Sequence, residues 1–284
     1  MGELNAMGTT EEFVRQGKLD EAVASLQAEV RKAPADPKLR VLLFQLFTLT
    51  GDWKRAATQL DVLKDLDAKT GPMVQTYGMA LQCERFRSEV FSGARTPLVL
   101  GEPPQWAAFL LECLKLSAEG HHAEAAALRQ KAFDLAPAVS GSVNGEPFQW
   151  IADADTRLGP MLEAIINGKY YWLPLGNLKA IHVEAPTDLR DFAWTPAQLT
   201  FANGGESVAF IPTRYPGSEG SSDPAIRMAR KTEWLEREGG LWCGLGQRVF
   251  ATDANEYSLL DVRAIEMNVS AAPAAASETA SADG

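Results

Sequence analysis

The chain has 284 residues, of which 46% are hydrophobic and 23% are charged, a balance typical of globular rather than disordered proteins. Its 27 Lys and Arg residues stand against 37 Asp and Glu residues, which gives a formal charge of −10. A surface with this charge repels phosphate backbones and anionic membranes, so the composition argues against a nucleic-acid-binding or membrane-binding protein. The length favours about two domains of roughly 150 residues each.

The first half of the chain is predicted to be helical. A short helix over residues 9–16 is expected to end at Gly17, and a second begins at Leu19 with apolar residues at helical spacing. Two further helices are expected over residues 37–49 and 53–66. Proline and glycine residues separate these segments, as they do at helix ends.

A sequence motif repeats through this helical half. The run Gly17–Ala22 returns as Gly51–Ala56 after 34 residues, and a third copy begins at Gly120. A period of 34 residues with paired helices is typical of tetratricopeptide (TPR) repeats. We therefore predict a TPR-like helical-repeat domain over residues 9–137. The alternative is an irregular helical bundle in which the similarity is fortuitous.

The pattern changes after the third copy. Residues 138–147 are rich in Gly, Ser and Asn and are predicted to form a connecting loop. One more helix is expected over 153–167, and a short one over 224–234. Tight turns are expected at Asn203–Gly205 and at Gly244–Gly246. Short β-branched or aromatic runs predict strands at 170–175, 178–184, 198–202, 207–212, 240–244, 247–252 and 257–266.

The predicted fold is α+β in two parts. The helical-repeat domain is followed by a β-rich domain over residues 145–267, expected to be a curled antiparallel sheet or open barrel with one or two helices. Residues 268–284 contain mainly Ala and Ser and are predicted to be a disordered tail. The N-terminus shows no secretory signal and no segment is long and apolar enough to span a bilayer, so a cytoplasmic location is expected.

Residues that commonly hold metals or do catalysis are sparse. The cysteines and histidines lack the spacing of a metal site or disulfide framework, so buried reduced thiols and no metal or cofactor are expected. The residues concerned are Cys83, Cys113, Cys243, His121, His122 and His182.

Two segments carry residue types that serve in binding. Residues 146–155 combine Glu146 and Trp150 with the close pair Asp153 and Asp155. Paired carboxylates can do acid–base work, although a helix-capping role for the aspartates is the simpler explanation.

The second segment, residues 211–219, places Arg214 and Tyr215 between prolines. Arginine and tyrosine often anchor interfaces, so a recognition loop is one interpretation. The other is that Arg214 pairs with Asp153 or Asp155 and fastens the loop to its domain.

Large apolar residues of the helical half could line a docking groove or fill its core. The candidates are Phe44, Phe47 and Trp53. A core position is the better expectation for them, because large apolar residues in repeats usually hold neighbouring helices together.

Several motifs resemble those of one known family, the ImpE/TagJ accessory proteins of bacterial type VI secretion systems. The resemblance covers roughly residues 9–267, and its C-terminal motifs are the more specific ones. The matching segments are 17–22, 30–34, 39–41, 44–46, 145–148, 150–155, 157–160, 168–172, 211–218 and 244–248.

The resemblance implies a non-catalytic adaptor. Such a protein would link the small sheath subunit (TssB-like) of the contractile cytoplasmic sheath to the AAA+ ATPase (ClpV-like) that dismantles it. A groove formed by helical repeats suits a partner helix, which we expect to dock there. Two alternatives remain: a generic TPR scaffold outside secretion, and an enzyme with an acidic pocket at the domain junction.

Overall fold

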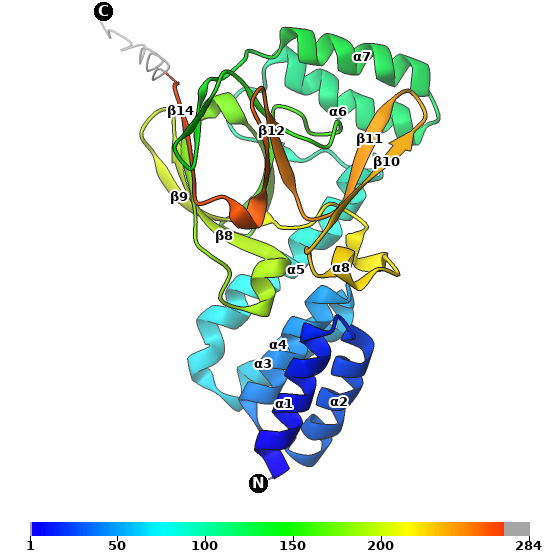
Figure 1. Ribbon diagram of the computed structural model, residues 1–284, viewed down its shortest axis with the longest axis vertical. Coiled ribbons are helices and arrows are strands. Elements are labelled where there is room, and N and C mark those ends of the chain that lie inside the picture. The colour runs from blue at the N-terminus through cyan, green and yellow to red at the C-terminus, as the bar shows by residue number, and fades with distance from the viewer. Residues whose placement is uncertain (1, 270–284) are drawn as a thin grey trace, which may run out of the picture.

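The computed structural model of the protein describes residues 2–269, with side chains from residue 8 onward. Helices occupy the first half of the chain and strands dominate the second, which confirms a mixed α+β fold in that order (Figure 1). The helices are α1 (Gly2–Arg15), α2 (Leu19–Lys32), α3 (Pro37–Leu49), α4 (Trp53–Leu66), α5 (Gly71–Phe91), α6 (Gln105–Ala118), α7 (His122–Leu135) and α8 (Pro224–Arg227).

Helices α1 to α4 pack side by side at one end of the elongated molecule (Figure 1). Gly17 and Gly51 join paired helices with φ angles of 75° and 71°, a left-handed conformation that side chains disfavour. Ala22 and Ala56 are fully buried where the helices meet, and their small size permits a close approach. The first helix begins at Gly2, so it is longer than the predicted 9–16.

The third copy of the repeated motif lies apart from the other two. Helices α6 and α7 form a hairpin at the opposite end of the molecule, and the long helix α5 connects the two groups (Figure 1). The hairpin packs against the β-rich part, where Arg129 donates a hydrogen bond to the Gly239 carbonyl at 2.6 Å. It therefore does not continue the stack of α1 to α4.

The strands form three sheets. The largest has nine strands in the order β1-β6-β5-β9-β8-β7-β14-β2-β3, antiparallel except for the β1–β6 pair, and the others are β10-β11 and β13-β12-β4. Strands β1 and β3 are the two edges of the nine-stranded sheet, and they do not pair with each other in the described chain. The sheet therefore does not close into a barrel. The strands are β1 (Leu98–Val99), β2 (Gly141–Val143), β3 (Glu146–Phe148), β4 (Ile151–Asp153), β5 (Met161–Ile166), β6 (Lys169–Pro174), β7 (Leu178–Val183), β8 (Trp194–Phe201), β9 (Glu206–Pro212), β10 (Thr232–Arg237), β11 (Leu241–Gly246), β12 (Val249–Thr252), β13 (Glu256–Ser258) and β14 (Ala264–Met267).

The helix predicted over residues 153–167 is wrong. The segment contains the end of β4 and all of β5, a central strand with every residue buried. A strand buried on both faces has a continuous apolar run, and such a run cannot be distinguished from a buried helix by periodicity alone.

Other boundaries also differ from the prediction. The expected loop at 138–147 contains β2 and the start of β3. The expected helix at 224–234 stops at Arg227, and β10 follows it. The strand predicted over 257–266 is two strands separated by the turn Leu259–Asp261.

The turn predicted at Gly244–Gly246 is also misplaced. These residues lie inside β11, and Gly239 and Gly240 make the turn of its hairpin with β10. Gly244 serves packing instead, since a Cβ there would lie 2.2 Å from the Tyr215 ring. The three cysteines are buried free thiols, as expected. Of the predicted tail, residues 270–284 lie outside the described residues.

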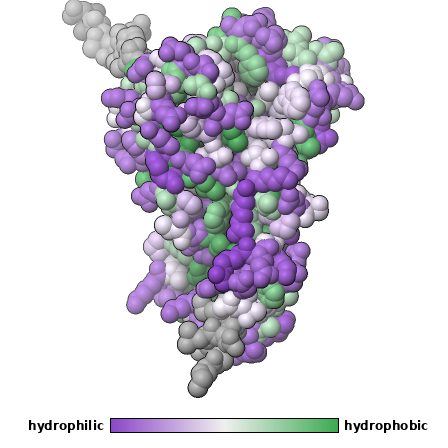
Figure 2. Space-filling view, viewed as in Figure 1, coloured by the Kyte–Doolittle hydropathy of each residue, from purple (hydrophilic) through white to green (hydrophobic). Residues whose placement is uncertain are grey.

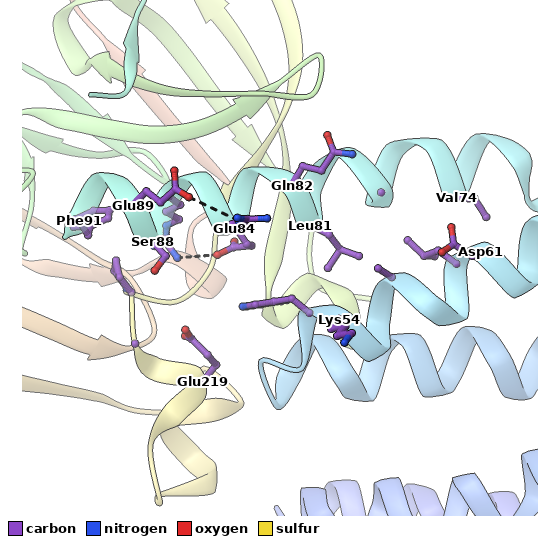
Figure 3. Close-up of a pocket in the computed structure, with 18 residues that line it drawn as sticks. Lys54, Asp61, Val74, Leu81, Gln82, Glu84, Ser88, Glu89, Phe91 and Glu219 are labelled. Atoms are coloured by element: carbon purple, nitrogen blue, oxygen red, sulfur yellow. Dashed lines mark hydrogen bonds and ion pairs between the residues drawn. The ribbon is translucent and has the colours of Figure 1, made fainter. Parts of the chain in front are cut away.

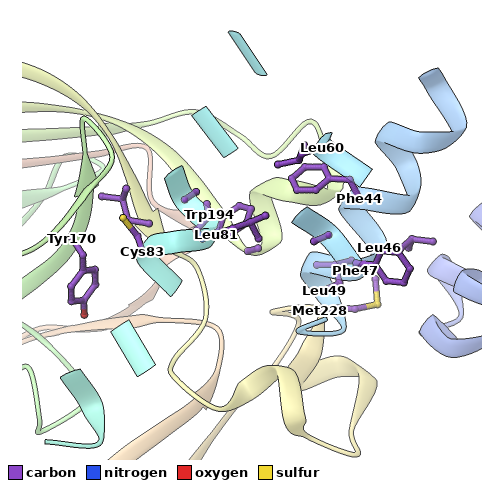
Figure 4. Packing of buried hydrophobic residues seen from close by; sticks show 14 of the residues in the cluster. Phe44, Leu46, Phe47, Leu49, Leu60, Leu81, Cys83, Tyr170, Trp194 and Met228 are labelled. Atoms are coloured by element: carbon purple, nitrogen blue, oxygen red, sulfur yellow. The ribbon is translucent and has the colours of Figure 1, made fainter. Parts of the chain in front are cut away.

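One hydrophobic cluster joins the helices to the large sheet. Phe44 and Phe47 of α3 lie in it with Leu81 of α5, and Trp194 and Tyr170 enter it from the sheet (Figure 4). On the face seen in Figure 2, hydrophobic side chains are visible in the recess between the helical end and the sheet end, and also at the end formed by α6 and α7. A second buried cluster lies within the β-rich part.

We expect Trp194→Ala to lower the free energy of unfolding by about 3–5 kcal/mol, measured by urea titration. The indole is fully buried, contacts the rings of Trp53 and Tyr77, and donates a hydrogen bond to Glu84 at 2.8 Å. As a control, Val208→Ala should change stability by less than about 0.5 kcal/mol, because Val208 is 74% exposed. Equal stabilities for the two variants would contradict this account of the core.

Candidate functional site

A cleft of about 1010 Å³ lies between α4, α5 and the loop at residues 216–219 (Figure 3). It runs from the Val74 and Asp61 end to an end that Glu219 helps to close. Its lining residues are Trp53, Lys54, Ala57, Leu60, Asp61, Val74, Gly78, Leu81, Gln82, Glu84, Arg85, Arg87, Ser88, Glu89, Phe91, Pro216, Gly217 and Glu219.

The floor of the cleft is apolar because each helix turns a stripe of small or hydrophobic residues toward it. On α4 the stripe contains Trp53, Ala57 and Leu60, spaced by four and three residues. On α5, Val74 and Leu81 are separated by seven residues, which is about two helical turns. Residues at these spacings share one helix face, so the two stripes form a continuous floor.

Charged residues surround the floor. Lys54 and Asp61 are exposed on the α4 side, while Arg85 on the α5 side pairs with Glu89 at 3.7 Å. At the closed end, Glu219 packs its side chain over Gly51, where a Cβ would lie 2.5 Å from the Glu219 Cγ. The cleft therefore combines apolar surface with charges of both signs.

Beneath the closed end lies a buried network of charges. Arg87 of α5 donates to both carboxylate oxygens of Glu163 on β5, at 2.5 and 3.0 Å. Arg248 donates to the same carboxylate and also to Asp153. Tyr170 donates its hydroxyl hydrogen to Glu163. The network thus connects α5 to the sheet through one glutamate held by two arginines.

Burial and neighbouring charges shift the carboxyl groups of this network in different directions. Burial by itself would raise the pKa of Glu163, but the charges of Arg87 and Arg248 outweigh it and lower the pKa to about 2. For Asp153, burial prevails over Arg248 and raises the pKa to about 6. Burial also raises the pKa of Glu84, against the opposing effect of Arg87.

Arg214 fastens the loop of residues 213–218 to the helical half. Its guanidinium donates to the carbonyls of Leu49 and Thr48 at 2.9 Å each, and also to the Arg227 carbonyl. The first two carbonyls belong to the last turn of α3, where carbonyls lack helical partners and a cation is favourable. The predicted pairing of Arg214 with Asp153 or Asp155 is wrong, because those acids bind other arginines.

The side chains of Asp153, Asp155 and Tyr215 are also buried and form hydrogen bonds inside the protein. Tyr215 is fully buried and donates to the Asp153 carboxylate at 2.9 Å. Asp155 is fully buried, pairs with Arg157 and accepts a hydrogen bond from the Gly244 amide at 2.9 Å. None of these three lines the cleft, and the prediction that Asp153 or Asp155 caps a helix is wrong because no helix begins there.

The remaining candidates from the sequence separate into core and surface. Phe44 and Phe47 lie in the core, whereas Trp53 lines the cleft and packs on Trp194. Glu146 is exposed and accepts a hydrogen bond from the Tyr257 hydroxyl at 2.7 Å. Trp150 is 39% exposed, also on the β-rich part.

Sequence reasoning missed Glu163, Arg87, Arg248 and Glu84. Glu163 is a single acidic residue within an apolar run. An acidic residue in a buried segment needs a buried cationic or hydrogen-bonding partner, so its position could have indicated one. No local pattern links it to Arg87 or Arg248, which are distant in sequence. Arg248 lies in the family-matching segment 244–248, but no role was predicted for it from the sequence.

The described residues contain no group of three or more His, Cys, Asp or Glu side chains placed to hold a metal ion. Within residues 2–269, no helix is long and apolar enough to cross a membrane.

Comparisons with known proteins give the family. Residues 145–266 match the family model described as ImpE protein. The chain is also 53% identical over 256 residues to the type VI secretion system accessory component TagJ of Pseudomonas aeruginosa, covering 90% of each chain. The chain belongs to the ImpE/TagJ family.

The ImpE/TagJ chain also has a counterpart among solved structures. A crystal structure of a Vibrio parahaemolyticus protein superposes with a TM-score of 0.83, covering 91% of this chain and 97% of that one. The two are 20% identical, so the likeness shows a shared fold alone.

We expect Glu163→Gln to destabilise this ImpE/TagJ protein by about 3–5 kcal/mol at neutral pH, because Arg87 and Arg248 lose their shared buried counter-charge. The pKa of Glu163 is lowered in the fold, so its stabilisation is present above its ordinary value of 4.5 and is lost as the pH falls toward about 2. Urea titrations should therefore show the difference between wild type and variant shrinking over that range. A difference independent of pH would contradict the ion-pair account.

We expect Arg214→Ala to lower the melting temperature strongly, since two buried carbonyls and one partly buried carbonyl would lose the Arg214 donor. Arg214→Lys should recover part of the loss, because an ammonium keeps the charge but not the planar set of donors. Thermal unfolding followed by circular dichroism measures both. If Arg214→Ala melts as the wild type does, the loop is not fastened through this side chain.

Proposed function

We propose that the protein is a non-catalytic adaptor of a type VI secretion system, and that it binds a helix of a partner in the cleft between α4 and α5. The observation that carries the proposal is the pair of apolar stripes that make the cleft floor. Partner helices insert apolar residues spaced by three, four and seven into grooves of this kind. The printed name of the Pseudomonas aeruginosa relative supports the secretion system.

The proposed partners are the small sheath subunit (TssB-like) and the AAA+ ATPase (ClpV-like), in the cytoplasm. The family resemblance supports both, and an adaptor between two proteins needs two surfaces. We assign the cleft to one partner and the β-rich part, with Trp150 and Glu146 exposed on it, to the other. Arg214 and Tyr215 act indirectly in this proposal, by holding the loop that closes the cleft.

We also propose that α1 to α4 are TPR-like repeats within a helical domain over residues 9–137, and that residues 145–267 form the second domain. The 34-residue spacing of Gly17 and Gly51, both left-handed at helix turns, supports the repeat. In TPR-like arrays the helices build one face for a partner. Here α4 and α5 supply that face.

A pull-down of the purified protein with purified TssB and ClpV from the same secretion system tests the adaptor role. We expect the wild type to retain both, and Ala57→Glu to weaken the cleft partner about tenfold, since a charge would enter the apolar floor. The matched control is Ala127→Glu on the exposed side of α7, which should bind as the wild type does. If the wild type retains neither protein while TssB and ClpV bind each other, the adaptor proposal is wrong.

A further inference from the structure

Gly78 leaves the backbone of α5 open to the cleft. The residue lies in the middle of a 21-residue helix, where glycine is less stable than alanine. Its φ is not positive, and no atom lies within 4 Å of the place that a Cβ would take. No contact within the described chain therefore requires a glycine here. Glycine does allow a ligand's backbone to approach the helix closely.

The closed end of the cleft carries two carboxylates, those of Glu84 and Glu219. Glu219 lines it and has no ion-pair partner within 4 Å in the described part of the chain, although its charge acts on the buried Arg214. The buried Glu84 forms an ion pair with Arg87 at 3.4 Å, longer than the contacts of Arg87 with Glu163, and accepts a hydrogen bond from Trp194. Arg85 is engaged by Glu89, so it does not neutralise Glu219.

Lys54 is the remaining cation of the lining and forms no ion pair within residues 8–269. It stands on the α4 wall, with its backbone one turn before the floor residue Ala57. Glu84 already has Arg87 and Trp194 as partners, whereas Glu219 has no ion-pair partner within 4 Å among the described residues, so the closed end can take a further cation at Glu219. The formal charge of −10 on the whole chain would speed the approach of a basic partner.

We propose that the cleft accepts a basic amphipathic helix that crosses α5 in close contact at Gly78 and places a lysine or arginine beside Glu219. The inference rests on the proposed function only in taking the cleft as the docking site. The apolar stripe of the bound helix would cover the cleft floor of Trp53, Ala57 and Leu81. The ion pair at the closed end would fix the direction of the bound helix.

Two synthetic helical peptides of about 18 residues test the proposal. Both carry the same Leu and Ala stripe, and only the residues that flank the stripe differ, Lys in one and Glu in the other. Fluorescence anisotropy with the full-length protein measures their affinities at low and high salt. We expect the Lys peptide to bind about tenfold more tightly than the Glu peptide, and the difference to shrink at high salt.

Variants of the protein then separate the cleft from general charge attraction. Gly78→Leu should weaken the Lys peptide about tenfold or more while the melting temperature does not fall, since leucine favours helix. Glu219→Gln should weaken it about fivefold, whereas Glu21→Gln, which removes an exposed charge on α2 outside the cleft, should leave it unchanged. Gly78→Ala is the conservative control, and its smaller side chain should weaken binding less than leucine does.

The proposal is overturned if the Glu peptide binds as well as the Lys peptide, if Gly78→Leu keeps the wild-type affinity, or if Glu21→Gln weakens binding as much as Glu219→Gln. These outcomes are independent of the pull-down. A wild-type protein that captures TssB or ClpV but fails the peptide test would retain the adaptor role and lose only this account of the bound helix.

Discussion

The contact of Glu163 with Arg87 and Arg248 is the interaction on which the arrangement of the two halves depends. A single carboxylate at the centre of the sheet binds an arginine from α5 and another from the segment before β12. Buried charges are tolerated only when they are paired and hydrogen-bonded, so these three side chains require one another. Because Arg87 belongs to the helix that forms one wall of the cleft, the same contact positions that wall against the sheet.

The cleft is thus a product of both halves of the chain. Its two walls are helices, but its closed end is a loop that follows β9, and Arg214 binds that loop to the last turn of α3. The hydrophobic cluster around Trp194 spans the same junction. The shape of the cleft is thus set by contacts within the chain, which would reduce the entropy lost if a partner binds there as proposed.

Much of the fold follows from local sequence. Helices α2, α3 and α4 begin where the helical spacing begins, and the turns at Gly17 and Gly51 occur where glycine permits a left-handed backbone. The strand β5 could not be identified in this way, because burial on both faces removed the alternation that marks a strand. For the site, Trp53 was a candidate from the sequence, but the wall formed by α5 was not.

The sequence by itself determined the family, the order of helices before strands and the presence of an unusual Arg214 loop, since these depend on residues close together in the chain. The tertiary structure alone decided that Arg214 binds helix carbonyls rather than an acid, that Glu163 binds two arginines, and that Gly78 faces an open cleft. The partners of a buried charge are selected by proximity in space. Residues 76 and 85 positions from Glu163 supply those partners, and no local pattern connects positions so far apart.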